Sequence, residues 1–279
     1  MNVAVIRFEI MNQTELMVAV GAFLGSKEVL GKLLGPTAEY FGGGLKDYTV
    51  IGVGNLKCLF RSAVDKLGTR IDQQGAVPPR VFRAVLENGY FVNDQLTLEY
   101  FGGVLASSRT SIARDDRGTS FCHLLESLSA YEIRAHYVLY SCFIEAMQNN
   151  DANIARVSVR NNLLMYLPQS YFDHLMDFSD SEDSEMLTSH AIAGLVGSKL
   201  LAGSSWGNPS VIHKNHDISV DQPGIVTRMT TKGIELYYWA HGYGDKHIRE
   251  FLDGSVDYPS AVGIEIDGSQ LTSYDKNRE

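Results

Sequence analysis

Residues 121–147 read FCHLLESLSAYEIRAHYVLYSCFIEAM, and the rest of the chain is best interpreted outward from this stretch. Apolar and aromatic residues recur along it at helical spacing, which indicates a buried helical block. The pattern breaks at Ser129, and Glu132 follows three positions later. Ser and Glu at this spacing form a capping box, in which each side chain binds the backbone N–H of the other residue. We therefore expect a new helix to begin at Ser129.

Helical patterns also dominate the residues before this block. Residues 52–74 repeat the apolar positions of an amphipathic helix, and shorter helices are expected at 79–89 and 93–108. Either Asn93 or Asp94 is placed to cap the last of these helices. The first half of the chain is thus predicted to be helical.

Strand signals lie after the block. RVSVR (156–160) is a candidate short strand. The helix that begins at Met186 is expected to stop near Gly203, and 204–222 has the composition of a loop. Residues 224–242 then combine a short strand-like run with a threonine-capped aromatic helix.

These patterns predict a mainly α protein of the α+β class. A helical N-terminal region occupies 1–112, and a winged-helix-like region with a small β component occupies 120–252. Residues 253–279 form a polar tail that is either partly disordered or contains a late strand. We find no repeat of fixed period and no low-complexity tract.

Composition is that of an ordinary globular protein. The 279 residues are 44% hydrophobic and 20% charged, with a net charge of −9. Residues 171–279 carry 17 acidic and 8 basic side chains. This balance argues against duplex DNA as a partner, because phosphate binding depends on clustered Lys and Arg.

Hydropathy and cysteine content predict a cytoplasmic protein. No run reaches the about 18 apolar residues of a membrane span. The three cysteines, Cys58, Cys122 and Cys142, are odd in number and form no CxxC pair, as expected of reduced thiols.

No motif predicts a catalytic centre, a metal or a cofactor. GVGN (52–55) lacks the lysine and spacing of a phosphate-binding loop. His213 and His216 lie close to Asp217, and we interpret them as residues of a surface loop without a third ligand. Cys122 and His123 are adjacent, but on a helix they point about 100° apart, so we interpret Cys122 as a buried cysteine and not as a nucleophile.

The aromatic run Tyr237, Tyr238 and Trp239 has two interpretations. The rings could form a stacking platform, but three consecutive residues cannot share one helix face. We therefore favour packing in the core.

The stretch GKLLGPTAEYFGGGLKDY (31–48) is apolar yet rich in helix breakers. We interpret 14–48 as a helical hairpin that packs at rest and is released to a membrane or a partner, with close packing in a core as the alternative. The predicted lipid- or partner-binding residues are Leu16, Val20, Phe23, Leu30, Leu34 and Phe41. The predicted hinge residues are Gly35, Pro36, Gly42, Gly43 and Gly44.

Five segments occur in the same order as in the Abi-alpha family of bacterial abortive-infection proteins, which this chain resembles. They are LGKLLGPTAEYFGGGLKDY (30–48), VPPRVFRAVLENGYFVNDQLTLEYFGGVLASS (77–108), SFCHLLESLSAYEIRAHYVLY (120–140), SEMLTSHAIAGLVGSKLLA (184–202) and VTRMTTKGIELYYWAHG (226–242). The resemblance covers residues 30–245 and implies a role in defence against bacteriophage. It implies no catalytic residues.

The sequence therefore predicts a non-enzymatic component of an anti-phage system that acts through lipid, membrane or protein contacts. Its expected partner is another protein of that system, with membrane lipid and self-association as further partners. It would be cytoplasmic and associate with the membrane on activation. The alternatives are a nucleic-acid-sensing winged-helix protein and a defence hydrolase or nuclease.

Overall fold

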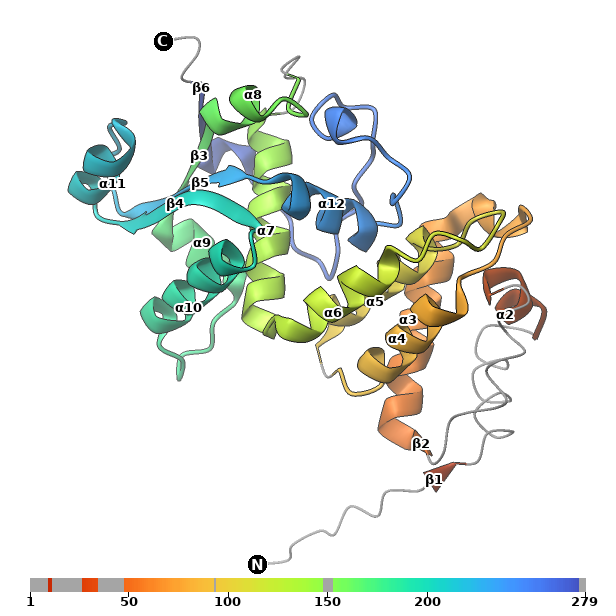
Figure 1. Cartoon of the computed structure of the whole chain (residues 1–279). Coiled ribbons are helices and arrows are strands. Elements are labelled where there is room, and N and C mark those ends of the chain that lie inside the picture. Colours follow the sequence, from red (N-terminus) through yellow and green to blue (C-terminus); the bar gives the residue numbers. More distant parts are fainter. Residues whose placement is uncertain (1–9, 12–26, 35–47, 93, 148–152, 276–279) are drawn as a thin grey trace, which may run out of the picture. The chain divides into compact units, whose positions relative to one another are not determined.

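The structure of this chain is a computed structural model that divides into two compact units. The residues that it describes are 10–11, 27–34, 48–92, 94–147 and 153–275. Unit 1 comprises Met1–Glu126 and Trp239–Gly244, and unit 2 comprises Ser127–Tyr238 and Asp245–Glu279. Both units are mainly helical, and a four-stranded antiparallel sheet lies in unit 2 (Figure 1). The predicted mainly α class with a small β component is confirmed.

Unit 1 is a set of helices with a two-residue strand pair. Its elements are β1 (Ile10–Met11), α2 (Lys27–Leu34), β2 (Tyr48–Thr49), α3 (Val50–Leu67), the 3-10 turn η2 (Gly68–Asp72), α4 (Pro79–Gly89), α5 (Gln95–Ser107) and α6 (Gly118–Ser127). β1 and β2 pair antiparallel. Of the two residues predicted to cap α5, Asp94 is the N-cap. Its carboxylate accepts a hydrogen bond from the Thr97 N–H at 2.8 Å.

Helix α5 is the centre of unit 1, and it is buried on almost every side. A helix that is apolar all round is expected to lie in a core. Two consecutive glycines let other backbones come close to it. A Cβ at Gly102 would lie 2.9 Å from the Leu59 carbonyl oxygen. A Cβ at Gly103 would clash with the carbonyl group of Ala240. These glycines therefore set the packing of unit 1.

Unit 2 contains the remaining elements. They are α7 (Ala130–Met147), α8 (Val157–Asn162), β3 (Leu163–Pro168), α9 (Gln169–Met176), α10 (Ser184–Gly197), β4 (Leu201–Gly207), α11 (Pro209–His216), β5 (Gly224–Met229), α12 (Thr231–Ala240), the 3-10 turns η3 (Ile248–Glu250) and η4 (Gly268–Gln270), and β6 (Thr272–Asp275). The last two residues of α12 are counted in unit 1. The strand order is β4-β5-β3-β6.

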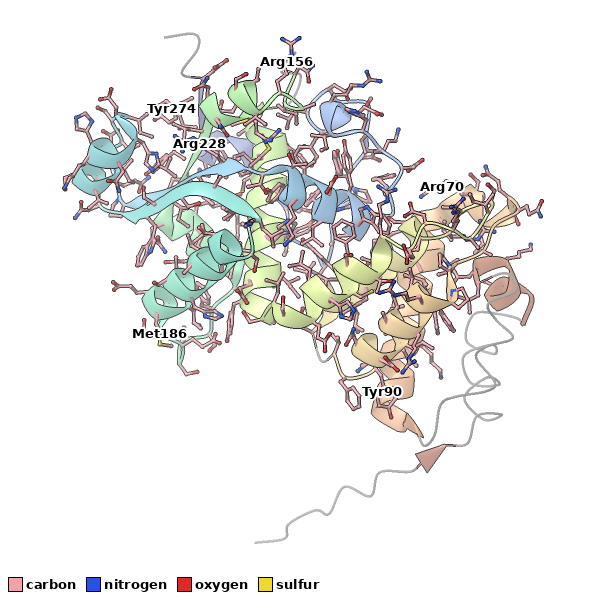
Figure 2. All side chains as sticks on the ribbon, viewed as in Figure 1. Arg70, Tyr90, Arg156, Met186, Arg228 and Tyr274 are labelled. Atoms are coloured by element: carbon pink, nitrogen blue, oxygen red, sulfur yellow. The ribbon has the colours of Figure 1, made fainter. Side chains whose placement is uncertain are left out.

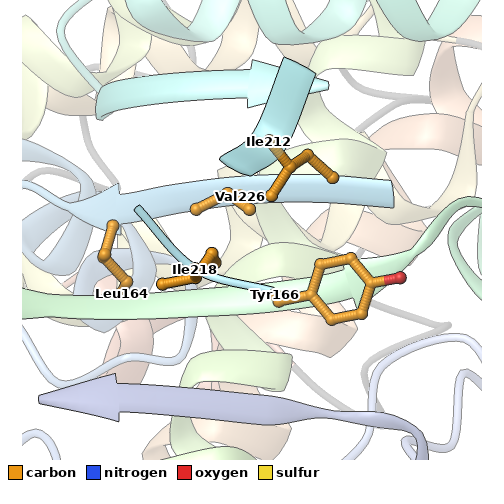
Figure 3. Close-up of a cluster of buried hydrophobic side chains, with 5 residues drawn as sticks. All are labelled: Leu164, Tyr166, Ile212, Ile218 and Val226. Atoms are coloured by element: carbon orange, nitrogen blue, oxygen red, sulfur yellow. The ribbon is translucent and has the colours of Figure 1, made fainter. Parts of the chain in front are cut away.

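Strand β3 is buried along its whole length, as expected of an apolar run covered on both faces. On one face, Leu164 and Tyr166 pack with Val226 of β5 under Ile212 of α11 and Ile218 (Figure 3). The register pairs Tyr166 with Val226, so their side chains point to the same side of the sheet. Helix α11 thus closes one face of the sheet.

The helix starts that the sequence predicts in unit 2 are confirmed by their caps. The Ser129 N–H donates to the Glu132 carboxylate at 2.6 Å, and the Glu132 N–H donates to Ser129 Oγ at 3.3 Å. At α12, the Gly233 N–H donates to Thr230 Oγ1 at 2.9 Å.

Three segment assignments of the sequence are wrong. RVSVR forms the start of helix α8, with Arg156 (labelled in Figure 2) at the N-cap position, and the strand is the next segment, Leu163–Pro168. A strand at 156–160 would alternate polar residues with valines, whereas β3 is apolar throughout and fits a sheet centre. The late strand predicted as one alternative for the tail is present as β6, which pairs with β3.

The other two wrong assignments concern the end of α10 and the segment after it. Helix α10 ends at Gly197, because Lys199 takes a left-handed φ of 61° and the Leu200 N–H bonds the Leu195 carbonyl at 2.8 Å. The segment 204–222, predicted to be a loop, contains part of β4 and helix α11. Asn208 caps α11, and Pro209 takes its first position.

A candidate ligand cavity in unit 2

A cavity of about 510 Å³ lies in unit 2. One face of α7, Tyr237 of α12 and the segment 251–266 bound it. Sites for small organic molecules have volumes of about 300–1,000 Å³ and combine apolar walls with a few polar groups. The cavity meets both conditions, so we treat it as the candidate functional site.

The first wall is a single face of helix α7. Tyr137, Ser141, Ile144 and Glu145 line the cavity. Their spacing of four, three and one residues places them on one side of a helix. The capping box at Ser129 sets where α7 begins, and thereby fixes the rotation of this face.

The second wall is the segment 251–266, which is tied to α7 by a long-range hydrogen bond. The Ala261 N–H donates to the Tyr137 hydroxyl at 2.8 Å. Within the segment, Ser260 Oγ donates to the Ile264 carbonyl at 2.6 Å. Gly254 turns the chain with a φ of 75°, a conformation that glycine adopts without strain. The wall is thus held by backbone and hydroxyl bonds rather than by a regular element.

Aromatic rings lie at the base of the cavity. The Tyr237 ring centroid is 6.0 Å from that of Tyr137, 5.8 Å from that of Phe251 and 5.5 Å from that of Tyr258. Phe251 and Tyr258 are themselves 5.8 Å apart. Such edge and offset contacts stabilise a rigid aromatic cluster. The cavity therefore has a preformed aromatic base.

The charged groups at the cavity are all acidic. Glu145, Asp257 and Glu265 line it, and none of the lining residues in the described structure is Lys, Arg or His. All three are exposed residues, whereas the aromatic residues are buried or, at Tyr258, half-buried. A cleft lined by one sign of charge focuses its field on a ligand of the opposite sign.

Burial changes the acidity of two of the phenols that line the cavity. Burial raises the pKa of Tyr237, and the neighbouring Tyr137 raises it further. Burial likewise raises the pKa of Tyr258, together with Tyr238. Ser141 Oγ lies 2.9 Å from the Tyr237 hydroxyl, so its closest described partner is a neutral phenol and not a base. This contact gives Ser141 no base that would activate it as a nucleophile.

Unit 1 contains a polar cluster of a different kind, which joins α3 to α5. Ser62 Oγ donates to the Glu99 carboxylate at 2.6 Å, and the Lys66 ammonium bonds both Ser62 and Glu99. Burial lowers the pKa of Lys66, an effect that Glu99 partly offsets. Ser62 is only 5% exposed and already gives its proton to Glu99. We interpret the cluster as a structural ion pair.

The described part of unit 2 contains two serine–histidine contacts. Ser129 Oγ is 3.1 Å from His190 Nε2, but the Glu132 carboxylate approaches that same nitrogen at 3.8 Å. A catalytic triad needs the acid on the other ring nitrogen. The second contact joins Ser205 Oγ of β4 to His216 Nε2 at 2.6 Å. It fastens α11 to the strand beneath it.

The interpretation of His213 and His216 as residues of a surface loop is wrong: neither lies in a loop, and only His213 is at the surface. Both lie on helix α11, where His213 is exposed and His216 is 5% exposed. His216 is the last residue of α11, and its ring is buried against β4, where it contacts Ser205. The core interpretation of Tyr237, Tyr238 and Trp239 agrees with their burial to 2% exposure or less.

Most of the lipid- and hinge-residue predictions lie outside the described residues. Those outside are Leu16, Val20, Phe23, Phe41, Gly35, Pro36, Gly42, Gly43 and Gly44. Leu30 lies in α2, with no side chain described, and Leu34 at the end of α2 is fully buried. These predictions concern a different part of the chain from the cavity.

Sequence reasoning missed the cavity. The residues of its first wall carry a signal, because a tyrosine, a serine and a glutamate follow at four-residue spacing on a helix. The second wall carries none, since the segment 251–266 has no periodicity, and Ala261 lies 124 residues from its partner Tyr137.

No group of three or more His, Cys, Asp or Glu side chains in the described ranges could hold a metal ion. Over the same ranges, none of the helices has both the length and the apolar character that crossing a bilayer requires. Comparison of the chain with known protein families, curated proteins and solved structures gives no match. The resemblance to the Abi-alpha family stays a prediction.

Proposed function

We propose that this chain is a non-enzymatic binding protein that takes up a small organic molecule in the cavity of unit 2. The observation that supports this proposal is the cavity itself, with about 510 Å³ of space between α7 and the segment 251–266. A preformed aromatic base and a few polar groups are the usual composition of such sites. The neutral phenol beside Ser141 favours binding over catalysis.

A fragment screen by ligand-observed NMR tests this function. We expect several fragments to bind the wild-type protein and to lose binding when Ser255→Trp fills the mouth of the cavity. Ser255 lines the cavity on an exposed stretch of chain, so the variant should fold. Ser189→Trp, at an exposed position of α10 away from the cavity, is the matched control.

The outcome is decided by the pair of variants. Fragments that bind the wild type and Ser189→Trp but not Ser255→Trp would support the cavity as the site. A screen without hits, or hits that bind all three proteins equally, would refute the proposed function.

We further propose, from the resemblance to abortive-infection proteins, that ligand binding serves defence against bacteriophage. In this proposal the protein acts with a partner protein or with membrane lipid through 14–48. Cells that carry the wild-type chain should show fewer plaques than cells that carry Ser255→Trp. Equal plaque counts for the wild type, Ser255→Trp and an empty vector would refute the defence role. The proposed binding function would not be affected by that result.

The winged-helix-like arrangement of 120–252 stays a prediction, and nucleic-acid sensing depends on it. The excess of 17 acidic over 8 basic residues in 171–279 disfavours duplex DNA as the ligand. A hydrolase or nuclease remains the other alternative, and a metal requirement for activity would favour it.

A further inference from the structure

We propose that Arg228 of β5 forms a second binding site in unit 2, for the oxyanion group of a small molecule, a carboxylate or a phosphate. Arg228 is not one of the residues that line the cavity, so this site is separate from it. The inference therefore goes beyond the proposed binding function and does not depend on it. A guanidinium without a counter-charge and a strand shaped to receive it both support the site.

Arg228 lacks a partner in the fold. Its side chain makes no hydrogen bond and no ion pair with any residue in the described ranges, although its Nε atom is buried. Burial lowers the pKa of Arg228, and no described carboxylate acts against that shift. A buried N–H without a partner costs free energy, as does a charge partly withdrawn from water. A bound oxyanion removes both costs, whereas a water molecule would satisfy the N–H and leave the charge uncompensated.

The neighbours of Arg228 on the sheet are neutral. Arg228 pairs with Ala202 of β4 and lies on the same face as Val226, two residues earlier on β5. Its diagonal neighbour on β4 is Ser205, which pairs with Val226. On this face, α11 covers Val226 through Ile212 (Figure 3). The face of the sheet therefore gives the guanidinium contacts but no negative charge.

Strand β4 is shaped to receive the guanidinium. The register between β4 and β5 shifts between Ala202 and Ser205, and Gly203 within this bulge has a φ of 55°. A Cβ at Gly203 would clash with Nη1 of Arg228, so the guanidinium lies directly against the glycine. Strand β4 is at the edge of the sheet, Gly203 is exposed and Arg228 is partly exposed. The bulge thus holds the guanidinium where a small ligand can reach it from solvent.

The chemistry of the guanidinium selects the class of ligand. Its N–H donors form a planar fork that matches two oxygens of a carboxylate or a phosphate. A nucleic acid fits poorly, because phosphate backbones are bound by clustered basic side chains, whereas 171–279 carries 17 acidic and 8 basic residues. The site is therefore suited to one oxyanion group of a small molecule.

The test follows the Nε–H signal of Arg228 in proton–nitrogen NMR spectra of the full chain. Inorganic phosphate is titrated in one series and acetate in another, with chloride at equal ionic strength as the control. The signal is assigned by its absence from the spectrum of Arg228→Lys. We expect at least one of the two oxyanions to give a saturable shift, with a dissociation constant on the order of millimolar for a few charge-assisted hydrogen bonds. The anion that binds more tightly identifies the ligand group.

Two variants locate the binding. Arg228→Lys keeps the positive charge and loses the fork, so it should weaken binding about tenfold, as measured from the backbone N–H signals around Gly203. Arg156→Lys is the matched control, because Arg156 is an exposed arginine of the same unit (Figure 2), and it should leave binding unchanged. Far-UV circular dichroism checks that both variants are folded. The titration of the wild type decides the question even if Arg228→Lys does not fold.

Three results would overturn the site. They are an Arg228 signal that neither oxyanion shifts, a shift that chloride reproduces at equal ionic strength, and equal binding by Arg228→Lys and Arg156→Lys. None of them bears on the cavity, which is tested by fragments and by Ser255→Trp. Conversely, a fragment screen without hits would refute the cavity and leave the Arg228 site standing.

Discussion

The carboxylate of the unit 1 ion pair and the carboxylates of the unit 2 cavity have different surroundings. In unit 1, the Glu99 carboxylate is matched by the Lys66 ammonium and by the Ser62 hydroxyl, within tightly packed helices. In unit 2, Glu145, Asp257 and Glu265 surround a cavity to which no described lining residue brings a positive charge. The unit 1 carboxylate joins α3 to α5, whereas those at the cavity give its lining a single sign of charge.

Glycines show the same difference. Gly102 and Gly103 in α5 let backbones meet, so their lack of a side chain is used for packing in unit 1. Gly254 in unit 2 has a φ of 75° and shapes an irregular wall around open space. The glycine pair in α5 allows close packing, and Gly254 allows a turn beside open space. This comparison makes three quantitative predictions.

The largest expected effect comes from Gly103→Ala. Its new Cβ would overlap the carbonyl group of Ala240, a backbone neighbour that cannot turn away. We expect the free energy of unfolding of unit 1 to fall by about 3 kcal/mol or more, the upper range for overpacking. Each unit contains one of the two tryptophans, so Trp239 fluorescence in a Trp206→Phe background reports unit 1 during urea denaturation.

The control for this variant is Gly54→Ala on α3. A Cβ at Gly54 meets nothing within 4 Å, and alanine should stabilise the helix by about 0.5–1 kcal/mol. Thiol alkylation gives a second readout, because burial raises the pKa of Cys122 to about 12 and also raises that of Cys142. Cys122 in unit 1 should become reactive in Gly103→Ala before Cys142 in unit 2 does. Simultaneous exposure of both thiols would show that the units do not differ in stability.

The second effect is that of Glu99→Gln. The change removes the carboxylate that Lys66 and Ser62 share, and leaves a buried ammonium without its counter-charge. We expect a loss of about 1–3 kcal/mol in the free energy of unfolding. An unchanged value would mean that the ion pair contributes no net stability, as can happen when desolvation cancels attraction.

This effect should depend on pH with a defined sign. Burial alone would raise the pKa of Glu99, but its ion pair with Lys66 and the hydrogen bonds from Lys66 and Ser62 bring it below the usual 4.5. A lowered pKa in the folded state means that the contribution is fully present above the unfolded value and is lost as the pH falls through the folded one. The stability gap between wild type and Glu99→Gln should therefore shrink below about pH 4. A gap that widens in acid would contradict the assignment.

The smallest effect is that of Glu87→Gln, which breaks an ion pair in the same unit. The Arg83 guanidinium lies 2.8 Å from the Glu87 carboxylate, but the two side chains are 79% and 51% exposed. Exposed pairs of this spacing contribute about 0.3–0.5 kcal/mol. A loss as large as that of Glu99→Gln would show that burial is not what separates the two pairs.

Local signals explain which parts of the fold the sequence predicts. The starts of α5, α7 and α12 follow from side chains that bind backbone groups three residues away, at Asp94, Ser129 and Thr230. These contacts depend on no distant residue, so they can be recognised from spacing alone.

Non-local contacts explain what the sequence does not predict. The end of α10 depends on Lys199, a left-handed lysine where the usual signal is glycine. Strand β4 lacks alternation and is defined by its pairing with β5, across a bulge between Ala202 and Ser205. Helix α11 has a local signal in Asn208 and Pro209, which could have been used. The cavity depends on contacts between α7 and the segment 251–266, which lies more than a hundred residues further along the chain. No local sequence pattern predicts those contacts.

The division of unit 1 between two parts of the chain also affects the order in which the protein can be made and folded. Multidomain chains usually fold from the N-terminus as the ribosome releases them. Trp239–Gly244 belongs to unit 1, yet it emerges only after Ser127–Tyr238 has been synthesised. The surface of helix α5 at Gly103 is therefore left uncovered until the first part of unit 2, Ser127–Tyr238, has been synthesised. The unit that is translated first can be completed only late, and a nascent chain stalled before residue 239 would carry unit 1 in an unfinished form.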